Sequence, residues 1–334
     1  MKKLILFFGL IGMLSLASCD SASVKPLSLT GYVLEENPEI PFMRFPYRLE
    51  IKKNLLFAFD MASDSMFYHV LSYPGLDYLY SFGKKGNGPE EIILPTPFQF
   101  YKDELLVLDG ARAKLYCYEN VSQDSLRNPS FMDLGASRAV DFVKANDSVL
   151  LVEDLSGEGR LIKYSPSGNE KLYSIPQSDE HSEANALKAY LWRSFMSYNT
   201  ELNKLAMATQ SGDVLEIYDF ESGKSQVVVG DGGIPREEDQ IEGFHDIHWI
   251  GDEIYALYSG RSRDELSQKY ANGHREPDGG NWLNVYDSDG TLLKVYQLDC
   301  FINGFAYDRE KDRIVGITSN SDNPFVFFDL KVGL

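Results

Sequence analysis

The sequence predicts an all-β fold, a six-bladed β-propeller, from a strand pattern that occurs six times. Aromatic residues make up 13% of the 334 residues, and little of the chain has the spacing of an amphipathic helix, which favours one large β domain. Repeats of about 40–60 residues, each with several short strands, are typical of propeller blades. Two stacked β-sandwiches are the alternative, but they do not explain six copies of one strand pair. The first strands of the pairs are LFAFD (from Leu56), LLVLD (Leu105), VLLVED (Val149), LAMAT (Leu205), IYALY (Ile254) and IVGIT (Ile314).

A second strand follows each of these first strands. Turn segments rich in Gly, Asp, Asn and Ser come next, as in SPSGN and DSDGT, and they supply the backbone angles that a hairpin needs. The fourth residue of the second strand is aromatic in five of the six copies, whereas the first copy has Val70. The second strands are FYHV, LYCYE, LIKYS, LEIYD, LNVYD and FVFFD, and their aromatic residues are Tyr118, Tyr164, Tyr218, Tyr286 and Phe328.

The last repeat reaches Leu334 one strand short of a full blade. An unpaired edge would expose a row of backbone donors and acceptors. The segment LSLTGYVL, Leu27 to Leu34, has strand-like alternation and no partner of its own. We therefore predict that this N-terminal strand completes the sixth blade as its outer strand and closes the ring.

The N-terminal residues predict where in the cell the protein is located. A basic start, Met1 to Lys3, precedes thirteen apolar residues, which are too few to span a membrane but fit the core of a signal peptide. The run ends in LASC, which resembles a bacterial lipobox, so Cys19 is predicted to be acylated. A plain signal peptide with a chance cysteine is the alternative. The predicted segments are a lipoprotein signal peptide (1–18), a lipidated tether (19–27) and the propeller (28–334).

These segments place the mature protein in the cell envelope, held to the lipid bilayer by acylated Cys19. DSASVK after this cysteine lacks the run of acids expected of a surface-export signal, which favours the periplasmic side. The net charge of −18 has no compensating basic stripe, so nucleic acid is excluded as a partner. Cys117 and Cys300 lie far apart in strand-like runs, and we expect buried free thiols rather than a disulfide.

One loop carries a family resemblance. Its ten residues are FGKKGNGPEE (82–91), and the longer stretch to LYCYE resembles an NHL-type propeller repeat at Phe82-Gly83, Gly86, Gly88-Pro89, Glu91, Ile92, Pro95 and Leu106 to Asp109. With the lipobox, the chain resembles the TolB-like six-bladed propeller lipoproteins common in Bacteroidetes. That resemblance implies a fold and a location in the cell envelope, but it implies no enzymatic reaction. The loop itself is predicted to be a connector between blades, because Gly tolerates positive φ. The alternative is an anion site made by Lys84, Lys85 and turn amides.

Polar residues on the predicted inner strands are the candidates for ligand contacts. Propellers bind where inner strands converge, and an arginine-rich channel mouth suits an anionic sugar or a peptide carboxylate. In the alternative, these arginines pair with acidic residues of neighbouring blades. The ligand-binding candidates are Arg48, Arg138, Arg193, His245 and Asn303.

The segment HDIH, His245 to His248, is the best metal candidate. Residues two apart in a strand share a face, so Asp246 and His248 are expected to face the channel together, whereas His245 and His248 point apart unless a bulge intervenes. We predict no cofactor, with calcium or zinc at Asp246 and His248 as the alternative. No Gly-x-Ser-x-Gly or His-Glu-x-x-His pattern supports hydrolytic chemistry.

Two insertions complete the picture. Ser259 to Asn281 interrupts the fifth repeat, and RDELSQKYA within it is predicted to form one or two helical turns. Ser178 to Trp192 is predicted to cover the same face. We predict a non-enzymatic binding or scaffold module for a protein, peptide or glycan partner. The alternative is a metal-dependent hydrolase or lactonase with its site in the channel.

Overall fold

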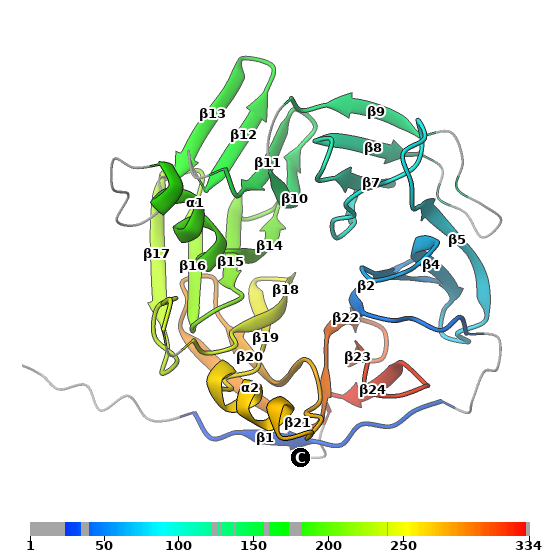
Figure 1. The fold of residues 1–334 in the computed structure, drawn as a ribbon, viewed down its shortest axis with the longest axis vertical. Coiled ribbons are helices and arrows are strands. Elements are labelled where there is room, and N and C mark those ends of the chain that lie inside the picture. Colours follow the sequence, from blue (N-terminus) through cyan, green and yellow to red (C-terminus); the bar gives the residue numbers. More distant parts are fainter. Residues whose placement is uncertain are drawn as a thin grey trace, which may run out of the picture.

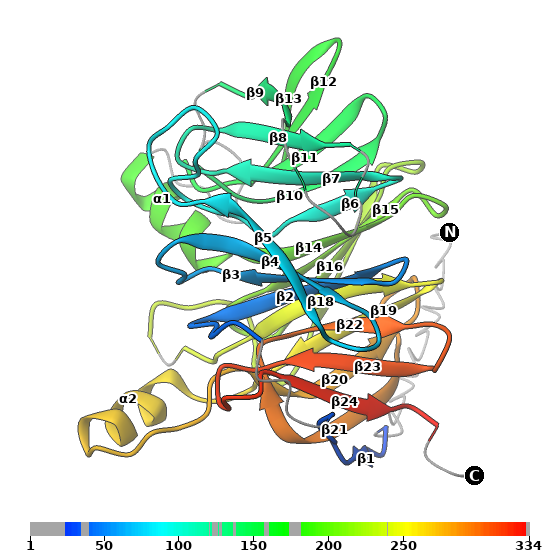
Figure 2. The same ribbon diagram turned by 90° about the vertical axis from the view of Figure 1, so that its right-hand side faces the viewer.

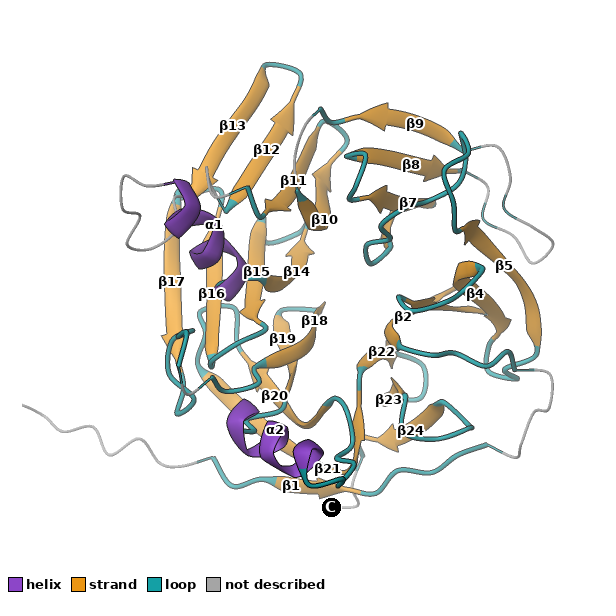
Figure 3. Ribbon diagram, in the orientation of Figure 1, coloured by secondary structure: helices purple, strands orange, loops and turns teal. Residues whose placement is uncertain are grey.

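The computed structural model describes residues 24–34, 40–119, 121, 126, 129–135, 138–156, 160–173, 182–238 and 240–331. Six antiparallel sheets stand around one axis like the blades of a propeller (Figure 1). The strands of each sheet follow one another in chain order from the axis to the rim, and the fifth sheet has an N-terminal strand added at its outer edge (Figure 3). The predicted six-bladed propeller is confirmed.

The first three blades have four strands each. Blade 1 comprises β2 (Pro46–Lys52), β3 (Leu55–Asp60), β4 (Met66–Ser72) and β5 (Tyr78–Lys84). Blade 2 comprises β6 (Gln99–Tyr101), β7 (Glu104–Asp109), β8 (Lys114–Tyr118) and β9 (Ser130–Asp133). Blade 3 comprises β10 (Ala139–Asn146), β11 (Val149–Asp154), β12 (Leu161–Ser165) and β13 (Gly168–Tyr173).

The other three blades differ in their outer edges. Blade 4 comprises β14 (Ser194–Asn199), β15 (Lys204–Thr209), β16 (Val214–Asp219) and β17 (Lys224–Val229). Blade 5 comprises β18 (Phe244–Ile250), β19 (Glu253–Tyr258), β20 (Gly280–Tyr286) and β21 (Leu292–Ile302), with β1 (Leu27–Leu29) added. Among the described residues, blade 6 comprises β22 (Gly304–Asp308), β23 (Arg313–Ile317) and β24 (Phe325–Asp329).

The strands that carry the sequence repeat are the second strands of the blades. They are apolar on both faces because each blade is packed between two others, and β3 is buried along its whole length. Phe57 of this strand packs against Phe98 and Phe100 of the blade 2 segment, at ring-centroid distances of 6.1 and 4.9 Å. The hydrophobic core therefore lies between blades.

An aspartate at the end of a second strand recurs in blades 1 to 3 and has one role. Its carboxylate accepts backbone N–H groups from the segment that enters the inner strand of the same blade. This contact aims each inner strand at the channel mouth. The bonds are Phe45 N–H to Asp60 (2.8 Å), Leu94 N–H to Asp109 (3.1 Å) and Arg138 N–H to Asp154 (2.8 Å).

The ring closes differently from the prediction, which places residues 27–34 on blade 6. Residues 27–29 form β1, which pairs in parallel with β21 of blade 5. Only Tyr32 pairs with blade 6, where it exchanges two backbone hydrogen bonds with Phe327 of β24 (3.0 and 2.8 Å). The N-terminal segment thus joins the outer edges of two blades, and it satisfies backbone groups on both.

The glycine loop is a connector, as predicted. Lys84 forms an ion pair with Glu91 (Nζ–Oε1 2.6 Å), and the other carboxylate oxygen of Glu91 accepts the Gly88 N–H (2.8 Å). Gly86 has a φ of 155°, and a side chain there would collide with Glu91. The loop's own carboxylate therefore takes the amide and the lysine that an external anion would need.

Both insertions form helices on one face of the ring (Figure 2). α1 spans Ser182–Leu191 and leads into β14, and α2 spans Arg263–Ala271, the segment predicted to be helical. Ser262 caps α2 by accepting the N–H of Glu265, and α2 buries none of its residues. A helix that packs so little is available for contacts with another molecule.

The remaining sequence predictions concern the cysteine thiols and the location of the protein in the cell. Cys117 and Cys300 are free and half-buried. Neither helix in the described ranges has the length and apolar character needed to span a bilayer. Cys19 and the predicted signal peptide lie outside the described residues.

Candidate binding site in the channel

Three β-bulges shape the channel. The pairing of the inner strand with the second strand shifts by one residue at the same place in blades 1, 3 and 5, at Tyr47, Val140 and His245. A bulge re-aims the side chains around it. The bulged residues line one channel mouth, and the next residue of each strand is a charged group buried on the channel axis.

Those three charged residues form what we call the axial cluster: Arg48, Asp141 and Asp246. The Arg48 Nε atom lies 3.1 Å from Asp246 Oδ1, and its Nη2 atom lies 3.9 Å from Asp141 Oδ2. Arg48 is 7% exposed and the two aspartates less. A single guanidinium therefore links three blades across the axis, as in the alternative in which arginines pair with neighbouring blades.

The aspartates of the axial cluster also hold the next blade. Asp141 accepts the Met196 N–H (3.1 Å) and Asp246 accepts the Phe305 N–H (3.0 Å). Burial raises the pKa of Asp141 to about 6, against the opposing charge of Arg48. Burial also acts to raise the pKa of Asp246, but His248 and Arg48 outweigh it and lower that pKa. The axis is thus charged and closely packed.

The metal hypothesis is tested by the same residues. Asp246 and His248 do lie together, with the imidazole Nε2 atom 3.0 Å from Asp246 Oδ2. A zinc or calcium site needs three or more protein ligands. In the described part of the chain, no three His, Cys, Asp or Glu side chains are grouped to hold a metal ion. Since Arg48 already contacts the Asp246 carboxylate, these residues do not fit a resident cation.

The mouth on the helix-bearing face holds a cavity of about 390 Å³, which we call the mouth cavity. Ligand pockets of proteins span about 300–1,000 Å³. Its walls are apolar and aromatic, and its polar groups gather on the side of blades 4 to 6. Its lining includes Phe45, Tyr47, Leu94, Phe195 and Phe244, with the polar residues Arg193, Gln210, Glu242, His245, Arg263 and Asn303.

Each of the two helices delivers an arginine to the mouth cavity. Arg193 follows α1, and its guanidinium stacks over the Tyr190 ring at 5.3 Å. Arg263 begins α2 and donates to Gln240 Oε1 (3.0 Å) and the Gln210 carbonyl (3.2 Å). Neither guanidinium has a carboxylate partner among the described residues. Both charges therefore remain available to an anion.

Asn303 supplies the most specific donor of the mouth cavity. Its side chain is 1% exposed, and its Oδ1 atom accepts the N–H (2.8 Å) and the hydroxyl (3.1 Å) of Ser319. These two donors fix the orientation of the amide, because only its oxygen can accept them. The buried Nδ2 atom then has no acceptor in the described chain. A buried donor without a partner costs about 1–3 kcal/mol, which a ligand oxygen would recover.

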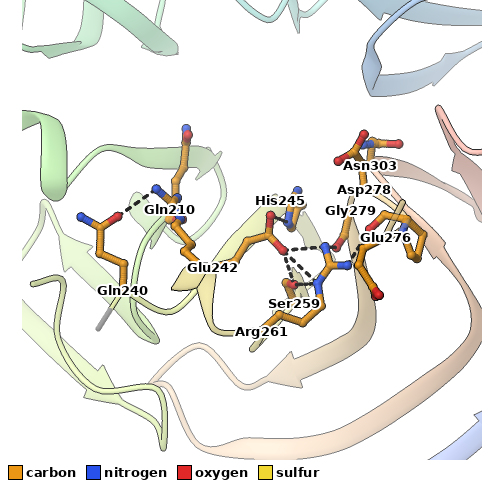
Figure 4. Close-up of polar contacts among 12 residues, drawn as sticks. Gln210, Gln240, Glu242, His245, Ser259, Arg261, Glu276, Asp278, Gly279 and Asn303 are labelled. Atoms are coloured by element: carbon orange, nitrogen blue, oxygen red, sulfur yellow. Dashed lines mark hydrogen bonds and ion pairs between the residues drawn. The ribbon is translucent and has the colours of Figure 1, made fainter. Parts of the chain in front are cut away.

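A network beside the mouth cavity neutralises its one carboxylate (Figure 4). Glu242 pairs with Arg261 (Nη2–Oε2 2.6 Å) and accepts the Ser259 hydroxyl (2.6 Å), and His245 lies 3.8 Å from its other oxygen. Burial acts to raise the pKa of Glu242, but these partners outweigh it and lower the pKa to about 2. Arg261 also donates to the Pro277 carbonyl (2.5 Å), which fixes the stem of the α2 insertion.

The opposite end of the channel holds a smaller cavity of about 230 Å³. Glu50 and His248 line it together with Gln99 and Arg309. Burial raises the pKa of Glu50 to about 7, against the charges of His248 and Arg48. His248 thus faces the other end of the channel from His245, which is itself the bulged residue of β18.

The structure brings together three of the predicted ligand-binding residues: Arg193, His245 and Asn303. Arg48 lies deeper in the axial cluster, and the side chain of Arg138 is exposed outside the mouth cavity. Sequence reasoning missed Arg263, although the predicted helix of the insertion begins with this residue.

Comparison with protein families gives one match over most of the chain. A family model described as TolB-like 6-blade propeller-like matches residues 32–310. A search of curated protein sequences gives no significant match.

Solved structures share the architecture at low sequence identity. They include a streptogramin B lyase (12% identity, TM-score 0.53, 90% of this chain and 97% of that chain) and the calcium-binding protein regucalcin from Agrobacterium tumefaciens (10%, 0.55, 92% and 95%). A member of the DUF4221 family from Bacteroides vulgatus is similar to the same extent (9%, 0.54, 92% and 97%). At these identities the likeness shows the fold alone.

Proposed function

Since the chain belongs to the TolB-like six-bladed propeller family, we propose that it is a lipid-anchored, extracytoplasmic binding module. Its mouth cavity holds an anionic group of a protein, peptide or glycan partner. The observation that carries this proposal is the buried Asn303 Nδ2 group, which has no acceptor in the described chain, in a cavity that also contains two arginines without carboxylate partners among the described residues.

The charges of the mouth cavity favour an anion within an acidic protein. Its lining contains Arg193 and Arg263 against one carboxylate, Glu242, which Arg261 already pairs. A planar guanidinium binds a carboxylate through two parallel hydrogen bonds. The aromatic walls supply the apolar contact that most ligand pockets use. A carboxylate attached to an apolar or ring-shaped group matches this lining.

The helix-bearing face gives a partner a larger surface. α2 buries none of its residues, and the stem of its insertion is held by Arg261 at the rim of the mouth cavity. A partner that inserts its anionic group into the mouth cavity would therefore contact α2 as well. This arrangement supports a scaffold role, in which the propeller holds another envelope molecule.

The location of the protein at the membrane is part of the same proposal. The lipobox at Cys19 supplies an acyl anchor, and the adjoining residues favour the periplasmic side. Such an anchor restricts the propeller to a volume close to the membrane, where even a moderate affinity for the partner suffices.

We expect the mouth cavity to distinguish acids from their neutral derivatives. Octapeptides with a free C-terminal carboxylate should bind residues 20–334 more tightly than the same peptides amidated, and oligogalacturonates more tightly than their methyl esters. R193A and R263A should each lower the affinity for the acid by about 10-fold or more, because each removes a charge-assisted hydrogen bond of about 1.5–3 kcal/mol. Isothermal titration calorimetry measures both comparisons.

The control is R138A, which removes an exposed arginine outside the mouth cavity and should leave the affinity unchanged. N303D retains the acceptor for Ser319 and places a negative charge in the mouth cavity, so it should abolish binding of the acids. Equal binding of acids and neutral derivatives, or an equal effect of R138A and R193A, would contradict the proposal.

Native mass spectrometry separates this function from the metal-dependent alternative. Residues 20–334 purified without chelator are expected to carry no stoichiometric calcium or zinc, because Arg48 occupies the Asp246 carboxylate. A stoichiometric ion that is lost in D246A would favour a hydrolase or lactonase, and would justify a screen of ester and lactone substrates.

A further inference from the structure

A third cavity, of about 600 Å³, lies between blades 4 and 5, and we call it the interblade cleft. It is separate from the mouth cavity but adjoins it, since Ile241 lines the cleft and Glu242 lines the mouth. The wall from blade 5 is β20, whose alternate residues Trp282, Asn284 and Tyr286 face the cleft together. Blade 4 contributes residues of β16 and β17 to the opposite wall.

The lining of the interblade cleft has its own chemistry. It contains three aromatic side chains, two carboxylates and one amide, and among its lining residues there is no Lys, Arg or His. An anion would therefore meet only negative charge here, and the preferred ligand of the mouth cavity is excluded. The aromatic and polar lining residues are Asp213, Asp231, Tyr258, Trp282, Asn284 and Tyr286.

The hydrogen-bonding groups of the cleft remain partly free. Asn284 donates its Nδ2 hydrogen to the Tyr286 hydroxyl (3.3 Å), which leaves its Oδ1 atom without a donor among the described residues. The indole ring of Trp282 is half-buried and lines the cleft. The cleft thus offers several acceptors together with the Tyr286 hydroxyl, whose hydrogen is not used in this bond, and such a set matches hydroxyl groups, which both donate and accept.

A glycine loop, at Gly232, lies close to the Tyr258 hydroxyl at one side of the cleft. A side-chain carbon at Gly232 would lie 2.4 Å from the Tyr258 hydroxyl and 2.9 Å from the Cβ atom of Asp213. Only glycine allows this loop to approach the cleft so closely. The volume of the cleft falls within the range of about 300–1,000 Å³ typical of ligand pockets.

We propose that the interblade cleft binds a neutral sugar unit, with the ring packed against Trp282 and its hydroxyl groups bonded to Asn284 and Asp213. A sugar ring has apolar C–H faces and a polar rim, which the aromatic faces and the free polar groups match in turn. This site is independent of the anion in the mouth cavity. A glycan with both neutral and acidic units could occupy the two cavities together, because they adjoin.

The test uses neutral hexasaccharides of glucose, xylose, mannose and galactose, titrated by calorimetry into residues 20–334. At least one of them is expected to bind, and W282A and N284A should each lower its affinity by 10-fold or more. The variant W192F/W249F leaves Trp282 as the sole tryptophan, so binding should change its fluorescence. The control W249F alters the cavity at the far end of the channel and should have no effect.

A cooperative thermal unfolding transition is used to check that each variant is folded. If W282A does not fold, the affinity of N284A alone decides the test. The double variant R193A/R263A should bind the hexasaccharide as the parent does, which separates this site from the mouth cavity. The proposal is overturned if no hexasaccharide binds at millimolar concentration, if W282A and N284A bind unchanged, or if amines bind the cleft in place of neutral sugars.

Discussion

Replacing Arg48 by methionine is expected to lower the free energy of unfolding by about 3–5 kcal/mol. The substitution keeps the apolar part of the side chain but removes the guanidinium from two buried carboxylates. Asp246 then retains only His248 as a charged partner (Nε2–Oδ2 3.0 Å), and Asp141 loses its nearest positive charge. A buried charge that has lost its partner is among the most destabilising changes in a core. Urea denaturation followed by circular dichroism measures the loss.

The matched control is R309M, which removes an exposed arginine at the end of the same channel. Its effect should stay within about 0.5 kcal/mol, as for most surface substitutions. The double variant R48M/D246N should recover part of the loss, because it removes a buried charge that has lost its guanidinium, while Asn can still accept the Phe305 N–H. If R48M costs no more than R309M, the axial cluster does not hold the ring together.

Replacing Glu153 by glutamine is expected to stabilise the protein at alkaline pH by an amount on the order of 5 kcal/mol. Glu153 is fully buried; its Oε1 atom accepts the Ser194 N–H (2.8 Å), but its Oε2 atom has no partner in the described chain. Burial raises its pKa from 4.5 to about 8, against the opposing charge of Arg160. Each pKa unit corresponds to about 1.4 kcal/mol between folded and unfolded states.

The sign of this effect follows from where the proton is held. Between about pH 4.5 and 8 the folded chain keeps a proton on Glu153 that the unfolded chain releases, so stability falls as the pH rises through this window. E153Q and the parent should therefore be equally stable near pH 4.5 and differ most near pH 9. Urea denaturation at a series of pH values measures this, with E201Q, at an exposed glutamate, as the control. Parallel curves for E153Q and the parent would show that Glu153 stays ionised in the fold.

Local chemistry made much of the ring predictable. The second strands are apolar on both faces, so their six runs stand out in the sequence, and the aspartates that end them satisfy backbone groups within the same blade. α2 was predictable for a similar reason, because RDELSQKYA carries its own cap at Ser262 and needs no packing partner. The connector at 82–91 satisfies its lysine and its turn amide with its own Glu91. Each of these elements is decided within a few residues or within one blade.

The channel could not be predicted in the same way. Arg48, Asp141 and Asp246 lie 93 and 105 residues apart in sequence, and each reaches the axis only because a bulge shifts its strand by one residue. A one-residue shift turns every following side chain to the other face of the sheet. The position of such a bulge cannot be recognised from the periodicity of the sequence. The prediction therefore identified polar residues on inner strands without separating Arg48, which pairs, from Arg193, which does not.

By itself the sequence determined the fold class, the blade order and the insertions, because short-range patterns and strand periodicity carry that information. The tertiary structure alone decided which polar groups are satisfied. The Nδ2 group of Asn303 is a free donor because Ser319 donates to the amide oxygen and so fixes the orientation of the amide. In the same way, the folded ring decides that β1 pairs with the edge of β21 in blade 5. Partners distant in the chain are chosen by packing and by the satisfaction of buried hydrogen bonds, which exist only once the ring is closed.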